Sequence, residues 1–312
     1  MADVQKHELI IVGAGPAALS AAIYTTREDV DTLLFERGAI GGLAAITDQI
    51  DNYPGFPQGV SGLQLADDLR AQAERFGAKI ELGEVTALTD EGEYKRLSTT
   101  SGDMLARAVL VATGSDYKKL GIPGEKKYYG RGVHYCATCD GAFYRGKRLV
   151  VVGGGNSAVQ EAIFLTRFAT HIDLLVRSTL KASDVLIREL EKHADKITIH
   201  LGTTTDEIVA GEDNMVNKVL GTKDGQTVEF ETDGVFVFVG LVPNSQFVEG
   251  TLALDEVGFI ETDQHLMTSL PGVFAAGDIR SGATMQVASA VGEGATAALK
   301  IREYLEKPLN DV

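Results

Sequence analysis

An internal repeat of a glycine-rich segment restricts the fold of this 312-residue chain more strongly than any other feature. Residues 10–27 (IIVGAGPAALSAAIYTTR) and 150–167 (VVVGGGNSAVQEAIFLTR) share eight identities in eighteen aligned positions. Their offset of 140 residues is too long for a solenoid, so the repeat indicates two copies of one folding unit. In each copy a β-branched apolar run precedes Gly-x-Gly-x-x-Ala, and an alanine-rich stretch follows. This order predicts a strand, a tight turn and a helix.

A second apolar strand, at 32–35 and at 172–175, would complete a βαβ unit in each copy. In such units the first glycine makes the turn, the second lets backbone amides approach a pyrophosphate, and the small third residue lets the helix pack on the strand. The helix N-terminus then faces the negative charge. These three roles fall to Gly13, Gly15 and Ala18, and to Gly153, Gly155 and Ala158. Two matches in the same context favour two nucleotide sites over ordinary glycine-rich turns.

The two copies differ at the end of the second strand. Glu36, 23 residues after Gly13, offers a carboxylate that can accept hydrogen bonds from a ribose diol. In the second copy the same register falls on Val176, and Arg177 follows. A cation without a carboxylate favours a 2′-phosphate, and so NADPH over NADH. The alternative is that Arg177 is a solvated arginine at a strand end.

Further elements suggest how the two copies are arranged. Strands are expected at 107–113, 233–240 and 273–276, and helices at 63–76, 186–193 and 288–305. The strand at 273–276 runs into Gly277-Asp278, and an aspartate there suits a hydroxyl-rich cofactor chain. If this tail folds beside the first copy, the second copy is an insertion. We therefore predict an α/β protein with two Rossmann-like dinucleotide-binding domains, one of residues 1–115 and 248–312 and an inserted one of residues 116–247.

Composition argues against several classes of function. The formal net charge of -15 disfavours nucleic-acid binding, which needs clustered lysine and arginine. No apolar run approaches the roughly 18 residues of a membrane span, so no membrane association is expected. The polar residues 1–8 and the short apolar run 9–12 do not fit a signal peptide, which predicts a cytoplasmic protein.

The chain has two cysteines, Cys136 and Cys139, in Cys-x-x-Cys spacing. In oxidoreductases this spacing supports a reactive thiolate, the nucleophile of disulfide exchange. Two cysteines and the nearby His134 do not supply the four ligands of a zinc site, so a redox pair is preferred to a metal site or to inert buried thiols. Asp140 could protonate a departing thiolate, or could be a turn residue before Gly141. His134 is either a second acid–base group or a structural histidine.

These segments together resemble the low-molecular-weight thioredoxin reductases, a group of flavoprotein disulfide reductases. The matching segments run along the whole chain: GAGPAA (13–18), Gly41-Gly42, Asn52-Tyr53-Pro54-Gly55, Ala112-Thr113-Gly114, CATCDG (136–141), GGGNSA (153–158), Pro243-Asn244 and AAGD (275–278). The glycine motifs occur in many flavoproteins, whereas CATCDG between them is specific.

The resemblance implies FAD in the discontinuous domain and NADPH in the inserted domain. FAD would bind Gly13, Gly15, Pro16, Ala17, Ala18, Glu36, Gly41, Gly42, Asn52, Ala112, Thr113, Gly114, Gly277, Asp278 and Gln286. NADPH would bind Gly153, Gly155, Asn156, Ser157, Ala158, Arg177 and Lys181. Hydride would pass from NADPH to FAD and on to the Cys136–Cys139 disulfide; Cys139 would face the flavin, Cys136 would attack the thioredoxin disulfide, and Asp140 would donate a proton. A homodimer is a further trait of the family.

Three positions depart from the family pattern, and the first leaves the electron donor open. The basic cluster that usually binds NADPH is reduced to Arg177 and Lys181, and lysine lacks the bidentate fork of arginine, so NADH or another donor remains an alternative. Leu43 follows Gly41-Gly42 where glutamine is usual. Met285 precedes Gln286 where a cation is common.

Four other activities compete with this interpretation. The chain could reduce another small redox protein, oxidise dithiols with FAD and oxygen, act as a flavin-bearing redox sensor, or be a ferredoxin–NADP reductase of the same architecture. The intact segment 153–158 argues against the oxidase. The pair Cys136 and Cys139 argues against the ferredoxin–NADP reductase.

Overall fold

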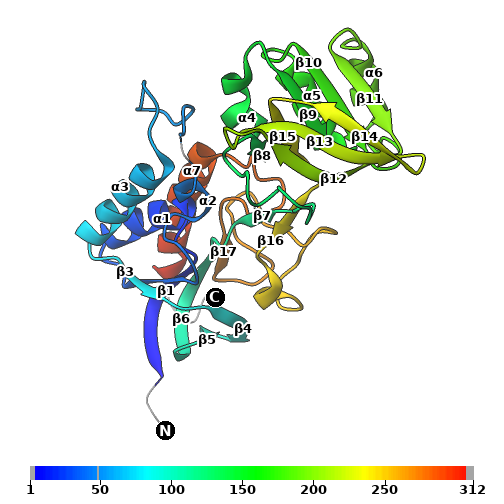
Figure 1. Cartoon of the computed structure of the whole chain (residues 1–312). Helices are drawn as coiled ribbons and strands as arrows, with labels where there is room; N and C mark the ends of the chain where they lie inside the picture. The colour runs from blue at the N-terminus through cyan, green and yellow to red at the C-terminus, as the bar shows by residue number, and fades with distance from the viewer. Residues whose placement is uncertain (1–3, 48, 307–312) are drawn as a thin grey trace. The chain divides into compact units, whose positions relative to one another are not determined.

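The computed structural model describes residues 4–47 and 49–306, and the chain divides into two compact units (Figure 1). The first unit contains residues 1–116 and 242–312, and the second contains residues 117–241. The second unit is thus inserted in the chain between two parts of the first. Where the chain passes from one unit to the other, β7 (Ser115–Tyr117) and β16 (Leu241–Pro243) pair as a two-stranded sheet.

The first unit is built on a sheet in the order β3-β2-β1-β6-β5-β4, with β17 paired to β6. Its strands are β1 (Gln5–Val12), β2 (Thr32–Glu36), β3 (Lys79–Leu82), β4 (Val85–Glu91), β5 (Tyr94–Thr99), β6 (Gly102–Val111) and β17 (Val273–Ala275). Strands β1, β2, β3, β6 and β17 run parallel, and β5 is antiparallel to both β4 and β6. Strand β6 pairs with β1 on one side; on the other side its first half pairs with β5 and its second half with β17.

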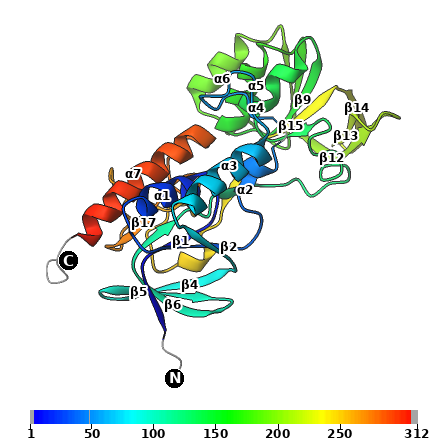
Figure 2. The ribbon, with the colours of Figure 1, turned by 90° about the vertical axis from the view of Figure 1, so that its left-hand side faces the viewer.

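Residues of β1 alternate between two hydrophobic cores, one on each face of this sheet. Leu9 and Ile11 pack on the face covered by α1 (Pro16–Thr26), α3 (Gly62–Arg75) and α7 (Val287–Leu305), whereas Ile10 and Val12 pack on the other face. Figure 2 shows these three helices together on one side of the sheet. A short helix, α2 (Gly42–Ala45), and a 3-10 turn, η2 (Gln246–Val248), complete the unit.

The helices of the first unit follow from local sequence. Helix α3 begins after Ser61, whose Oγ accepts the N–H of Gln64 at 3.1 Å, as expected of an N-cap. Its buried residues, Leu65, Ala66, Leu69 and Ala73, recur at helical spacing. Close packing of α1 on α7 needs small residues, because a Cβ at Gly294 would overlap the carbonyl oxygen of Ala17.

The second unit contains a parallel sheet in the order β11-β10-β9-β15-β8 and a separate antiparallel sheet, β12-β13-β14. Its strands are β8 (Val133–His134), β9 (Arg148–Val152), β10 (His171–Val176), β11 (Ile197–Leu201), β12 (Thr203–Ala210), β13 (Val216–Lys223), β14 (Gln226–Glu231) and β15 (Gly234–Val237). Its helices are α4 (Ala137–Asp140), η1 (Gly141–Tyr144), α5 (Asn156–Leu165) and α6 (Asp184–Glu191). One face of the parallel sheet packs on α5 and α6, and the other packs on the antiparallel sheet.

The order β9–α5–β10 repeats the order β1–α1–β2, and both units are Rossmann-like, so the predicted fold class is confirmed. Within the described part of the chain, no helix is both long enough and apolar enough to cross a membrane.

Candidate active site

The glycine turn between β1 and α1 leaves room for a ligand. Gly13 has a φ of 105°, and a Cβ there would overlap the carbonyl oxygen of Ala112, so the fold itself requires glycine. Gly15 is different, because its φ of -78° suits any residue and a Cβ there would meet no atom within 4 Å. The open space at Gly15 therefore fits a diphosphate at the N-terminus of α1, which begins at Pro16.

Glu36 ends β2 and is held in a fixed orientation by two backbone amides. Its carboxylate accepts the N–H of Ala14 and the N–H of Gly38, each at 2.7 Å. It lines a cavity of about 290 Å³ in the first unit. The other lining residues are Val12, Gly13, Phe35, Arg37, Gly83, Glu84, Val85, Thr86, Thr113, Asn244, Gln246 and Phe247. Apolar walls beside a ribose-accepting carboxylate fit the adenosine part of a dinucleotide.

Asn244 joins the segment Ala112-Thr113-Gly114 to the returning chain. Thr113 Oγ1 donates to the Asn244 carbonyl at 2.8 Å, and Asn244 Nδ2 donates to the Thr113 carbonyl at 3.1 Å. The Asn244 N–H also donates to the Gly114 carbonyl at 3.0 Å. Arg37 completes the cluster by donating to Asn244 Oδ1 at 2.8 Å. One wall of the cavity is therefore fixed by reciprocal hydrogen bonds.

Gly277 and Asp278 follow β17, as the sequence predicts. The Gly277 N–H donates to Glu293 at 2.8 Å, and Glu293 also forms an ion pair with Arg280 at 2.8 Å. Burial, and secondly the charge of Glu293, raise the pKa of Asp278 to about 6. A carboxyl in this state can hold or release a proton near neutral pH.

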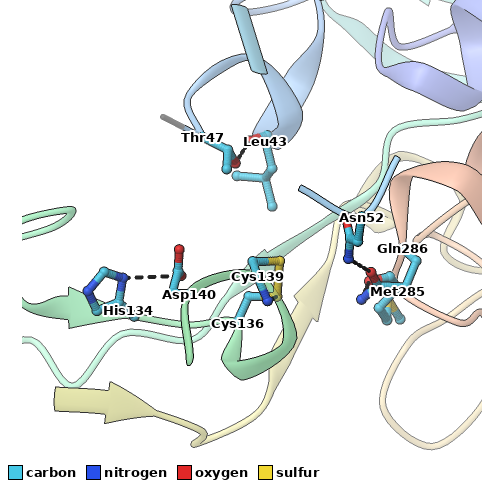
Figure 3. The surroundings of a disulfide bond; sticks show 9 residues. All are labelled: Leu43, Thr47, Asn52, His134, Cys136, Cys139, Asp140, Met285 and Gln286. Carbon is cyan, nitrogen blue, oxygen red and sulfur yellow. Dashed lines mark hydrogen bonds and ion pairs between the residues drawn. A yellow bond between two sulfur atoms is a disulfide. The ribbon is translucent and has the colours of Figure 1, made fainter. Parts of the chain in front are cut away.

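Asn52 and Gln286 come from distant parts of the chain and meet in the first unit. Asn52 Nδ2 donates to Gln286 Oε1 at 2.9 Å (Figure 3). Gln286 precedes α7, and its own Nε2 donates to the Met285 carbonyl at 2.8 Å. Met285 has a φ of 57°, a left-handed conformation that costs a non-glycine residue about 1–2 kcal/mol. This strained residue lies directly before Gln286 in the chain.

The glycine pair at the start of α2 allows a close approach between α2 and α3. Gly41 has a φ of 100°, and a Cβ there would overlap the Cβ of Ala66 on α3. Gly42 has a φ of 57° and begins α2. The Leu43 carbonyl accepts from Thr47 Oγ1 at 3.0 Å, within the same turn (Figure 3).

The second glycine turn, between β9 and α5, repeats the first. Gly153 has a φ of 142°, and a Cβ there would overlap the carbonyl oxygen of Phe238. Gly155 has a φ of -90° and open space around its missing side chain. Asn156 and Ser157 are exposed at the start of α5, whereas Ala158 is buried. This turn can therefore accept a second diphosphate.

The loop after β10 presents cations and no carboxylate. Val176 is buried, and Arg177 and Lys181 are exposed. The loop is fastened to the glycine turn, because the Lys181 N–H donates to the Gly154 carbonyl at 2.7 Å. Asn156 Oδ1 also accepts the Ser183 N–H at 2.8 Å. The exposed side chains of Arg177 and Lys181 are of a charge that would suit an additional phosphate on the ribose of a nucleotide.

Cys136 and Cys139 form a disulfide at the start of α4 (Figure 3). Both residues are partly buried, and Cys136 Sγ accepts the N–H of Cys139 at 3.2 Å. After reduction, the same N–H can stabilise a thiolate at Cys136. In the part of the chain that the structure describes, no three histidine, cysteine, aspartate or glutamate side chains gather as metal ligands would.

Asp140, the last residue of α4, contacts a buried histidine. His134 Nδ1 lies 3.1 Å from Asp140 Oδ2 (Figure 3), and His134 Nε2 lies 2.7 Å from the Tyr144 hydroxyl. Sequence reasoning left the role of His134 open and did not identify Tyr144. No local motif signals this contact, which depends on how β8 and η1 pack together.

Comparisons with known proteins agree with this chemistry. Residues 7–294 match the family described as pyridine nucleotide-disulphide oxidoreductase. The thioredoxin reductase of Bacillus subtilis (strain 168) is 41% identical over 308 residues, which cover 98% of this chain and 97% of that protein. The solved structure of thioredoxin reductase from Streptococcus pyogenes MGAS5005 superposes with a TM-score of 0.91 and is 39% identical, and the match covers 97% of this chain and 99% of that one. The structure of thioredoxin reductase from Giardia duodenalis also gives a TM-score of 0.91, at 32% identity, and the match covers 97% of this chain and 100% of that one. The chain therefore belongs to the pyridine nucleotide-disulphide oxidoreductase family, among its low-molecular-weight thioredoxin reductases.

Proposed function

We propose that this protein transfers electrons from NADPH, through FAD and the Cys136–Cys139 disulfide, to oxidised thioredoxin. The observation that carries the proposal is the disulfide itself, which lies in the same unit as the second glycine turn. In a chain with two cysteines, both in this bond, no other pair is left for dithiol exchange.

FAD would bind the first unit, residues 1–116 and 242–312. Its diphosphate would lie at Gly13 and Gly15, and its adenosine would enter the cavity beside Glu36, which the open space at Gly15 and the orientation of the carboxylate support. The remaining contacts would come from Pro16, Ala17, Ala18, Gly41, Gly42, Asn52, Ala112, Thr113, Gly114, Gly277, Asp278 and Gln286. When bound, FAD would accept a hydride from the reduced nicotinamide and supply two electrons to the disulfide.

NADPH would bind the inserted unit. Its diphosphate would lie at Gly153 and Gly155, with Asn156, Ser157 and Ala158 at the start of α5. Arg177 and Lys181 would face the 2′-phosphate, and the absence of a carboxylate at Val176 supports NADPH over NADH.

The cysteines and Asp140 would carry out the exchange with thioredoxin. Two electrons and two protons convert the Cys136–Cys139 disulfide into two thiols. Cys136 then attacks the thioredoxin disulfide as a thiolate, forms a mixed disulfide and releases one thioredoxin thiolate, which takes a proton. Cys139 attacks the sulfur of Cys136, which re-forms the internal disulfide and releases the second thioredoxin thiolate. Asp140 would supply the proton that a departing thiolate needs.

The decisive experiment follows nicotinamide oxidation by the FAD-loaded protein with oxidised thioredoxin. We expect one NADPH to be consumed for each thioredoxin disulfide reduced, and a slower reaction with NADH. The Cys136→Ser variant should keep its flavin and lose thioredoxin reduction. Turnover that needs only oxygen would instead identify a dithiol oxidase, and full activity of Cys136→Ser would contradict the proposal. Turnover with another small redox protein, and none with thioredoxin, would redirect the substrate assignment.

We further propose that the protein acts as a homodimer in the cytoplasm. The family resemblance supports the dimer. In the cytoplasm disulfides are usually transient and catalytic, and the two cysteines of this chain form one proposed redox pair. Light scattering should give twice the chain mass of 33.3 kDa. A particle of one chain mass would contradict the dimer.

A further inference from the structure

We propose that His134, held in one tautomer by Tyr144, positions the acid Asp140 and stabilises the carboxylate left after proton transfer; this inference rests on the proposed reductase function. The three side chains form a chain of contacts, with 3.1 Å from Asp140 Oδ2 to His134 Nδ1 and 2.7 Å from His134 Nε2 to the Tyr144 hydroxyl. Asp140 remains partly accessible to solvent, whereas the other two side chains are buried. The chain of contacts therefore has one open end, at the carboxyl.

Aromatic packing fixes the two buried rings. His134 stacks on Phe236 of β15, with ring centroids 5.1 Å apart and an interplanar angle of 27°. Tyr144 meets the same ring edge-on, at 5.6 Å and 81°. The backbone also leaves space for tyrosine, because a Cβ at Gly234 would overlap the Tyr144 ring. The imidazole cannot turn away from Asp140 without losing these contacts.

The Tyr144 hydroxyl decides which imidazole nitrogen carries hydrogen. Burial raises the pKa of Tyr144, and the charges of Asp140 and Asp233 raise it further, so the hydroxyl stays protonated. Asp233 itself forms an ion pair with Lys147 at 3.4 Å. A hydroxyl that keeps its hydrogen can donate to Nε2, and an ionised Asp140 carboxylate accepts only from a nitrogen that carries hydrogen. Together the two contacts favour a neutral imidazole with its hydrogen on Nδ1, facing Asp140.

This arrangement helps Asp140 to give up its proton during thiol exchange. The proton moves from the Asp140 carboxyl to the departing thiolate, and the Nδ1–H of His134 then stabilises the carboxylate that remains. The carboxylate, which remains partly accessible, then takes a new proton from solvent. His134 therefore assists proton transfer by stabilising the product carboxylate.

Three variants separate the hydrogen bond to Asp140 from a merely structural role of His134. His134→Asn keeps an N–H near the position of Nδ1, so its kcat should stay within about threefold of the wild type. His134→Ala loses this N–H, and its kcat should fall roughly 10- to 100-fold. Tyr144→Phe keeps the ring and loses the hydroxyl, so its kcat should fall by a smaller factor.

A matched control tests whether any histidine–aspartate pair would have this effect. His200 Nε2 lies 2.8 Å from Asp173 Oδ1 in the same unit, on strands that carry none of the proposed catalytic residues. His200→Ala should leave kcat unchanged. A kcat of His134→Asn as low as that of His134→Ala, or an equal fall in His200→Ala, would overturn the proposal.

A second measurement does not depend on turnover. Nitrogen-15 NMR of labelled histidine should show neutral His134 protonated on Nδ1 in the wild type, and this preference should weaken in Tyr144→Phe. An Nε2–H tautomer in the wild type would overturn the inference even in an active enzyme. Conversely, an Nδ1–H tautomer in a protein that fails to reduce thioredoxin would contradict the proposed function and leave the tautomer assignment standing.

Discussion

The two glycine turns have similar backbones and different surroundings. Gly13 and Gly153 both adopt a positive φ under a carbonyl oxygen, and Gly15 and Gly155 both border open space. The contrast begins where the second strand of each unit ends, at the oriented carboxylate of Glu36 in the first unit and at a buried valine followed by cations in the second. A repeated backbone would thus provide two diphosphate sites, and a few residues outside the repeat would give each site its charge.

The largest effect should come from the glycines that the fold requires. Gly13→Ala should lower the free energy of unfolding of the flavin-free protein by about 3 kcal/mol, since a left-handed alanine costs about 1–2 and steric overlap about 1–3. Gly153→Ala should lower the free energy of unfolding by a similar amount. The controls, Gly15→Ala and Gly155→Ala, should stay within about 0.5 kcal/mol and weaken only nucleotide binding. Urea unfolding measures the free energy of unfolding of each variant. An equal loss in Gly13→Ala and Gly15→Ala would show that the fold does not distinguish the first glycine of the turn from the second.

The acidic character of the first site predicts a pH dependence. In the folded protein the pKa of Asp278 is raised from 3.8 to about 6, so its protonated carboxyl stabilises the fold. This contribution to the free energy of unfolding is fully present below pH 3.8 and is lost as pH rises through about 6. The loss between about pH 4 and pH 7 should reach at most about 3 kcal/mol. Melting curves of the flavin-free protein should show this decline, and Asp278→Asn should flatten it. A decline of the same size in Asp278→Asn would assign it to other groups.

Glu36 tests whether the carboxylate marks the flavin site. Glu36→Gln should raise the Kd for FAD about 10- to 100-fold, because hydrogen bonds to a charged group contribute about 1.5–3 kcal/mol. Flavin fluorescence measures the Kd, and the exposed Glu81 on β3 offers a control, Glu81→Gln, that should bind FAD normally. Unchanged FAD binding in Glu36→Gln would show that the ribose lies elsewhere.

The smallest effects concern the cations of the second site. Arg177→Glu should raise KM for NADPH about tenfold and leave KM for NADH nearly unchanged, since only the phosphate charge is affected. Lys181→Ala should raise KM for NADPH about threefold, as expected for one exposed charge contact. Steady-state rates with both nucleotides provide the test. An equal loss for NADPH and NADH would mean that these side chains do not distinguish the two.

The elements with strong periodic patterns were predicted closely from sequence. Helix α3 was expected at 63–76 and spans Gly62–Arg75, and α7 was expected at 288–305 and spans Val287–Leu305. The predicted strand at 233–240 is shorter in the structure, because β15 ends at Val237 and the chain turns at Gly240, which has a φ of 110°. The antiparallel sheet β12-β13-β14 was not predicted, since its exposed strands bury few residues and carry a weak apolar pattern.

The candidate site shows the same division between local and distant signals. Glu36 could be singled out because its distance from Gly13 is set within one βαβ unit. The segment 83–86 lines the same cavity without any motif, since the pairing of β3 with β2 brings Gly83 beside Glu36. The contact between His134 and Tyr144 likewise depends on tertiary packing, which no periodicity encodes.

Strand β6 has a consequence for how the protein is made. Its second half needs β17, which the ribosome adds only after the entire inserted unit. The nascent inserted unit holds all the strands of its own sheets once residue 241 has emerged, whereas the first unit still lacks β17 and α7 at that moment. The inserted unit should therefore complete its folding before the first unit does. A ribosome stalled before β17 should carry a folded inserted unit joined to an incomplete first unit.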